Sequence, residues 1–296
     1  MDFITRLKNQ KDYKPYLYIL PSILLLIFVF FYPLIQNLYR SFFRFAAGKA
    51  IFYGLNHYKF LLLSDTIARR AFLNNLTLLL IVPVFLVLSI LFAVLITEKI
   101  RLRELYQTTI IIPYVISIVA AGVIFSRLLR FDGVINSILE KIGLDLLVFD
   151  WLGSPRLAIF ALMATIVWRE LPFGIILFIT GISNINPEIY EAAKIDGANW
   201  WQNLFHITIP QLKSVINFYV VYNVMVIFAW IFTYVYVLTS GGPINATTIL
   251  ELRIFNLAFK EFKMGRASAL AMLLFIMIFI FVYLQFKIRQ ETLEEV

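Results

Sequence analysis

Long apolar runs alternate with polar or basic intervals along the whole of the 296-residue chain. About six of these runs reach roughly 20 residues, the length that a helix needs to cross a hydrocarbon layer about 30 Å thick. A helix satisfies its own backbone hydrogen bonds in lipid, so we expect helices. The pattern predicts an all-α polytopic membrane protein with spans at about 16–39, 75–97, 106–129, 157–180, 214–238 and 267–286.

The intervals between the spans differ in character. Residues 1–15 form a basic tail, and the apolar run that follows is too long for a signal peptide and lacks a small-residue cleavage site. We therefore expect an uncleaved first span and one membrane domain over 16–290. The pair Asn74-Asn75 precedes the second span, where a helix N-cap is expected. The interval 244–263 is typical of a short amphipathic surface helix.

The composition supports a membrane protein and removes several kinds of chemistry. The chain is 61% hydrophobic and 15% charged, and a soluble protein of this length could not hide so much apolar surface. It has no cysteine, which excludes disulfides and thiolate chemistry. Its two histidines, His57 and His206, lie far apart, so we expect no metal site. The net charge of +8 comes from basic residues beside apolar runs, as membrane topology favours, so we expect no nucleic-acid partner.

A polar-rich interval, 181–213, separates the fourth and fifth spans. Pro187 opens a run of good helix formers, and Gly197 allows a sharp bend. An apolar stripe at spacings of three and four then predicts a second helix, which ends near Pro210. Such an element at a membrane surface suits docking into a groove of another protein, but it also suits lying on the lipid headgroups, and the pattern leaves both interpretations open.

The same interval contains Glu-Ala-Ala, a glycine after three residues, and Ile-x-Ile-Pro after nine more. This spacing resembles the EAA motif of ABC-importer permease subunits, with Ile209 where leucine is usual, a volume-conserving exchange. The resemblance implies a cytoplasmic coupling helix held in a cleft of an ATPase subunit. The coupling residues that it assigns are Glu191, Ala192, Ala193, Asp196, Gly197, Ile207 and Pro210.

The wider wording EAAKIDGAN, with Tyr190 before it, is similar to the carbohydrate-uptake branch of these permeases, the maltose and glycerol-3-phosphate type. The resemblance implies a second homologous permease subunit, two ATPase subunits that dock on 181–213, and an extracytoplasmic solute-binding protein. The chain has no G-x-x-x-x-G-K-[ST] phosphate loop. We therefore expect ATP and magnesium to be used by the partner ATPase and no cofactor to be bound by this chain.

The orientation follows from charge and from the number of spans. An even number of spans places both termini on one side of the membrane, and the basic tail and the cluster at 99–103 favour the cytoplasm. This orientation also places 181–213 in the cytoplasm, as the resemblance implies. We expect a multi-pass protein of a prokaryotic cytoplasmic membrane.

Two charged residues, Arg169 and Glu170, lie inside the fourth span, where charges are costly and usually face a cavity or a partner. Pro172 follows them, so we predict an interrupted helix that helps to build a solute path, with Trp168 and Phe173 as flat faces for a sugar ring. The alternative is a structural ion pair.

On the fifth span, Asn223 and Trp230 are predicted to share one helical face. We interpret them as lining the same path, although asparagine also joins helices in lipid.

The best hypothesis from the sequence is the membrane-spanning permease subunit of an ATP-driven ABC importer, which moves a sugar or oligosaccharide by alternating access. A related alternative keeps the permease but changes the cargo to glycerol phosphate or a polyol. Alternatives from other classes are an ion channel and a membrane-embedded enzyme.

Overall fold

The computed structural model describes residues 14–46, 48–98 and 103–294, which form two compact units. Unit 1 comprises residues 14–64 and 254–273, and unit 2 comprises residues 65–253 and 274–294. Within the described residues the only sheet is a two-stranded hairpin, and all other regular structure is helical. The predicted all-α membrane fold is confirmed.

Unit 1 begins with the apolar helical stretch Tyr16–Ser41, and within the described residues none of its most apolar window is buried. A helix that is hydrophobic on all sides needs lipid or a partner chain around it. The antiparallel hairpin follows, with Phe43 opposite Phe52. The elements are α2 (Lys14–Leu26), the π-helix η1 (Ile27–Phe31), α3 (Tyr32–Ser41), β1 (Phe43–Ala46), β2 (Lys49–Phe52), α4 (Asn56–Leu63) and the first turns of α17 (Met264–Glu294).

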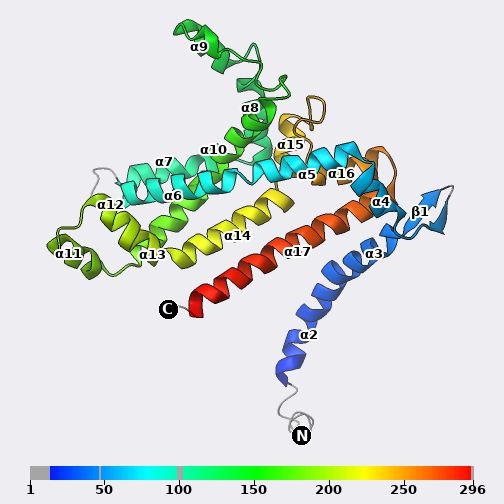
Figure 1. Ribbon diagram of the computed structural model, residues 1–296, viewed down its shortest axis with the longest axis horizontal. Coiled ribbons are helices and arrows are strands. Elements are labelled where there is room, and N and C mark those ends of the chain that lie inside the picture. Colours follow the sequence, from blue (N-terminus) through cyan, green and yellow to red (C-terminus); the bar gives the residue numbers. More distant parts are fainter. Residues whose placement is uncertain (1–13, 47, 99–102, 295–296) are drawn as a thin grey trace. The chain divides into compact units, whose positions relative to one another are not determined.

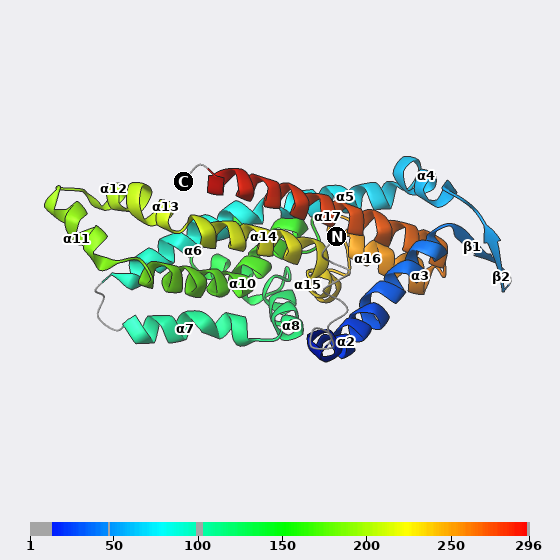
Figure 2. The ribbon, with the colours of Figure 1, turned by 90° about the horizontal axis from the view of Figure 1, so that it is seen from below.

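Unit 2 is a helical bundle in which α6 and α10 lie side by side, as both whole-chain views show (Figures 1 and 2). Its largest fully buried side chains include Phe85, Phe178, Tyr219 and Phe228. The main helices are α5 (Thr66–Leu78), α6 (Ile81–Thr97), α7 (Arg103–Val115), α8 (Ile118–Leu128), α10 (Ala158–Ser183), α14 (Lys213–Ala229) and α15 (Phe232–Leu238). The connecting elements include α9 (Val134–Lys141) and the 3₁₀ turn η2 (Asp145–Leu147).

In the described part of the chain, 4 helices are long and apolar enough to cross a membrane. The number rises to 6 if each of two bent helix pairs forms one span. The four helices are Tyr16–Ser41, Thr66–Thr97, Ala158–Ser183 and Met264–Gln285.

The third apolar run differs from the continuous helix expected over 106–129. It forms α7 and α8, which are bent by 90° about a break at Ile116. Ser117 caps the new helix, because its hydroxyl accepts a hydrogen bond from the Ala120 amide. The carbonyls freed at such a break need donors in lipid, and α10 supplies them.

The predicted interruption of the fourth span is wrong. The α10 helix continues through Pro172 without a break. The fifth run is interrupted instead, because α14 ends at Ala229 and α15 starts at Phe232. Asn223 is buried within α14, whereas Trp230, the C-cap of this helix, is 68% exposed.

Two expectations about the connecting segments are also corrected. The second span starts earlier, at Thr66, and its N-cap is Asp65 rather than the Asn74-Asn75 pair. Asn75 is buried within α5, where it donates to the Ile227 carbonyl and accepts from the Leu250 amide. The predicted surface helix within 244–263 forms the short α16 (Leu250–Phe255) and the π-helix η4 (Asn256–Lys260), whose leucines are buried.

Candidate coupling loop and intramembrane charge cluster

The interval 181–213 folds as a helix, a turn and a second helical segment. Asn186 caps the first helix and Pro187 occupies its first turn. Gly197 has a φ of 80°, a left-handed conformation that glycine adopts without strain. Asn199 and Gln202 then form a reciprocal capping box at the start of the next helical segment. The elements are α11 (Pro187–Ile195), α12 (Trp200–Gln202), the π-helix η3 (Asn203–Thr208) and α13 (Ile209–Gln211).

One side of this loop is fastened to the helical bundle. The Trp200 indole donates to the Glu98 carboxylate at 2.5 Å, and the Tyr190 and Thr208 hydroxyls are 3.1 Å apart. Leu204 is buried beside a cavity of about 280 Å³ between the loop and the ends of α6 and α10. These contacts fix the loop in unit 2, so it is not a free surface helix.

The other side of the loop is exposed. Ile195 is 86% exposed, and Trp201 and Phe205 are 61% and 56% exposed with their rings stacked 6.0 Å apart. We call Ile195, Trp201 and Phe205 the apolar face of the loop. Of the residues predicted to act in coupling, Ala193 and Ile207 are half-buried, whereas the exposed ones are Glu191, Ala192, Asp196, Gly197 and Pro210.

The two charges inside the fourth span form an ion pair. Arg169 Nη1 lies 2.6 Å from Glu170 Oε1, and both side chains are largely buried. Arg169 also donates to the carbonyls of Tyr114 at 3.0 Å and Ile116 at 3.1 Å. The Tyr234 hydroxyl donates to the same Glu170 oxygen.

Arg169 therefore stabilises the bend between α7 and α8. Its guanidinium satisfies backbone carbonyls at the break, and Glu170 neutralises its charge. A carboxylate accepting from two donors is suited to burial, and Tyr234 links it to α15. This geometry favours the structural ion pair among the two interpretations of these charges.

Aromatic side chains gather next to the ion pair, around Phe173. The Phe173 ring lies 4.7 Å from the Tyr222 ring and is stacked 5.8 Å from the Tyr114 ring. Trp168 contacts Phe125 instead, at 5.1 Å between ring centroids. The structure thus brings Arg169, Glu170 and Phe173 together and places Trp168 in a different contact.

Asn223 and Trp230 both belong to α14, Trp230 as its C-cap. The Asn223 amide donates to the Tyr219 carbonyl, one turn earlier in its own helix, and the Trp230 side chain projects from the end of α14.

Sequence reasoning missed two polar connections of unit 2. Tyr234 gave only the weak signal of one polar tip in an apolar run. Asp65 and Arg253, which form a buried ion pair at 2.7 Å, stand far apart in the sequence. Their pairing joins the N-cap of α5 to α16, and no local pattern reveals such a contact.

The fold and the site define a class of protein. It is a polytopic helical membrane protein with a loop that is fastened to the helical bundle on one side and exposed on the other. Residues 61–289 match the family described as "Binding-protein-dependent transport system inner membrane component". The chain belongs to this family.

Related proteins cover almost the whole chain. A probable ABC transporter permease protein of Pyrococcus horikoshii is 33% identical over 283 residues, covering 93% of this chain and 96% of the relative. The lactose transport system permease protein LacF of Rhizobium radiobacter is 30% identical over 290 residues, covering 96% and 97%. A bacterial ABC transporter involved in import of the acidic polysaccharide alginate has a chain of similar fold, with a TM-score of 0.83, 26% identity, and coverage of 95% and 96%.

Proposed function

We propose that this chain is the membrane-spanning permease subunit of an ATP-driven importer, and that it translocates a sugar or oligosaccharide by alternating access. The observation that carries the proposal is the exposed EAA motif, presented on a fastened loop by a chain of the binding-protein-dependent transport family. The cargo is supported by the related lactose permease and by the similar alginate importer.

The proposed assembly has four kinds of partner. Two ATPase subunits dock on the 181–213 loop, where Ile195, Trp201 and Phe205 fill an apolar groove and exposed Glu191 offers a carboxylate. A second homologous permease subunit covers apolar helices such as 16–41. An extracytoplasmic solute-binding protein delivers the carbohydrate, as the family description implies. Lipid of a prokaryotic cytoplasmic membrane surrounds the spans, and both termini lie in the cytoplasm.

The proposed solute path runs along the aromatic cluster of Phe173 and Tyr222. Flat ring faces suit the apolar faces of a sugar, and these half-buried rings lie beside a charge pair that needs no further partner. Asn223 and Trp230 remain in the proposed path, whereas Trp168, which contacts Phe125 instead, stays a prediction from the sequence. Arg169 and Glu170 act on it by holding the bend between α7 and α8.

A phosphate cargo is the second candidate among permease substrates. It needs a cation that is free to pair with the phosphate, and Arg169 is already paired with Glu170 and two carbonyls. A neutral carbohydrate is therefore favoured over glycerol phosphate.

The test of this function is a Gly197→Asp variant in the reconstituted importer. An unpaired carboxylate buried against the ATPase costs about 2 kcal/mol or more, so docking weakens by more than roughly tenfold. We expect sugar uptake to fall while the ATP hydrolysis that persists no longer responds to sugar-loaded binding protein. Uptake and hydrolysis are measured on the same vesicles.

The matched control is Gly143→Asp. Gly143 has a φ of 76° and, like Gly197, no atom within 4 Å of an added Cβ, so both substitutions carry the same local strain. The control variant keeps normal uptake and normal stimulation. Normal uptake by Gly197→Asp would remove the coupling role from this loop.

A further inference from the structure

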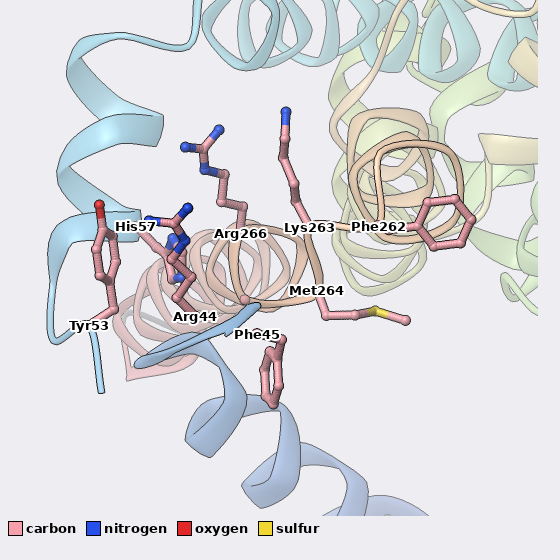
Figure 3. A pocket seen from close by; sticks show the side chains of 9 residues that line it. Arg44, Phe45, Tyr53, His57, Phe262, Lys263, Met264 and Arg266 are labelled. Atoms are coloured by element: carbon pink, nitrogen blue, oxygen red, sulfur yellow. The ribbon is translucent and has the colours of Figure 1, made fainter. Parts of the chain in front are cut away.

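Unit 1 contains a cavity of about 230 Å³ where the hairpin, α4 and the start of α17 meet (Figure 3). The side chains of Arg44, His57 and Arg266 gather on one side of the helix start (Figure 3). Phe45 and Met264 point to the other side (Figure 3). The cavity therefore has a cationic wall and an apolar rim.

The cationic wall carries uncompensated charge. Lys263 pairs with Glu261 at 2.7 Å, but none of the ion pairs found in residues 14–46, 48–98 and 103–294 involves Arg44 or Arg266. The Arg266 guanidinium lies over the Phe60 ring at 3.9 Å, which fixes its position without neutralising it. The first turn of α17 contains no acidic residue, so its amide groups add to the positive potential.

His57 supplies a buried polar atom without a partner. The residue is 4% exposed, and its Nε2 lies 3.1 Å from the Phe43 carbonyl, to which it donates. Its Nδ1 is buried and has no hydrogen-bond partner in the described residues. Burial lowers the pKa of His57, and the charges of Arg266 and Arg44 lower it further against the raising effect of the Phe43 carbonyl. The ring is thus neutral at pH 7 and adds no charge to the cationic wall.

The helix start approaches this histidine closely because residue 265 is glycine. A Cβ at Gly265 would lie 2.2 Å from the Phe43 carbonyl oxygen and 2.5 Å from His57 Nε2. Any other side chain would push α17 away from the hairpin. The cavity is therefore built by specific local packing and is not an accidental gap.

The position of the cavity relative to two apolar spans indicates what kind of ligand it could bind. One apolar span ends at Ser41, directly before the hairpin, and another begins at Met264, so the cavity lies at the boundary between hydrocarbon and water. Phe45 is 43% exposed and Phe262 78% exposed, as side chains beside acyl chains would be.

We propose that this cavity binds the headgroup of an anionic phospholipid, such as phosphatidylglycerol. The phosphate accepts from Arg44 and Arg266, and the acyl chains lie along Phe45 and Met264. On the orientation given in the proposed function, the lipid belongs to the outer leaflet.

Native mass spectrometry of the delipidated importer, purified with its partner subunits, tests this site. The importer is titrated with phosphatidylglycerol and, separately, with phosphatidylcholine. We expect wild-type protein to retain phosphatidylglycerol in preference to phosphatidylcholine. The double variant Arg44→Gln/Arg266→Gln should retain at least about tenfold less phosphatidylglycerol than wild type. Lys49→Gln, an exposed cation of the same hairpin outside the cavity, retains as much as wild type.

Three outcomes overturn the proposal. The first is equal retention of phosphatidylglycerol by the double variant and wild type. The second is that inorganic phosphate alone raises the thermal unfolding midpoint of the importer as much as phosphatidylglycerol does, which would identify a free-anion site. The third is unchanged lipid retention with lost stimulation by the binding protein, which would identify a protein-docking site.

Two further measurements keep the result interpretable. If the double variant does not fold, the phosphate titration and the lipid preference of the wild type still decide the question. Lipid retention is read without transport, so a failed lipid site leaves the coupling test at Gly197 untouched.

Discussion

The charge cluster of Arg169 and Glu170 and the 181–213 loop differ in whether their polar residues find partners within the chain. Arg169 and Glu170 are largely buried, with Arg169 donating to Glu170 and two carbonyls and Glu170 Oε1 accepting from Arg169 and the Tyr234 hydroxyl. On the loop, Glu191 and Asp196 are exposed beside an apolar face that is itself largely exposed in the described residues. The first group has its partners within the chain, whereas the second group is open to the ATPase that we propose as its partner.

This contrast separates the two meanings of a charge in a membrane protein. A charge within a span faces either a partner in the protein or a cavity. Arg169 has its partners at the break between α7 and α8, which supports a structural role for it. The exposed motif of the loop has no such internal explanation.

The largest expected effect is that of Arg169→Leu on folding. Removing the cation leaves Glu170 buried without its partner and two carbonyls without donors, and breaking a buried pair costs about 3–5 kcal/mol. We expect a marked fall in the thermal unfolding midpoint of the purified subunit and a low yield of monodisperse protein in detergent.

The double variant Arg169→Leu/Glu170→Leu sharpens this comparison, because it leaves no uncompensated charge. It should be more stable than the single variant, although it still lacks the donors to Tyr114 and Ile116. If Arg169→Leu folded with normal stability and lost only sugar uptake, the arginine would be a substrate ligand and the structural interpretation would fail.

A smaller effect is expected for Phe173→Ala on sugar affinity. One aromatic contact contributes about 1 kcal/mol, so the sugar concentration for half-maximal uptake should rise roughly fivefold. Trp168→Ala is the matched comparison, because Trp168 lies on the same helix but contacts Phe125. Half-saturation measured for both variants shows which face of α10 lines the path, and a larger rise for Trp168→Ala would place the path on the other face.

Much of this arrangement could be predicted from the sequence, because apolar length and turn chemistry are local signals. The fourth span, the bend at Gly197 and the helices on either side of it followed from such signals. The breaks in the third and fifth runs did not. Ile116 and Trp230 are ordinary apolar residues. The donors near these breaks come from other helices, Arg169 for the Ile116 carbonyl and Asn75 for the Ile227 carbonyl. Pro172 misled in the opposite direction, since packing in α10 tolerates it.

The 181–213 loop could also be predicted in part. Its motif and spacing indicated the residues proposed to act in coupling. The side by which the loop is fastened depends on Glu98, which stands about a hundred positions away in the sequence. The apolar face therefore emerges only from the folded chain.

The proposed coupling to an ATPase is best tested by purifying the tagged chain from its own membranes in mild detergent and identifying the bound proteins by mass spectrometry. We expect an ATPase and a second permease to be recovered with wild type, and Ile195→Asp to keep the permease but lose the ATPase. Leu146→Asp, at a site of η2 that is 92% exposed, should keep both partners. Recovery of the wild-type chain alone, or equal recovery of the ATPase with Ile195→Asp, would show that the loop does not dock an ATPase.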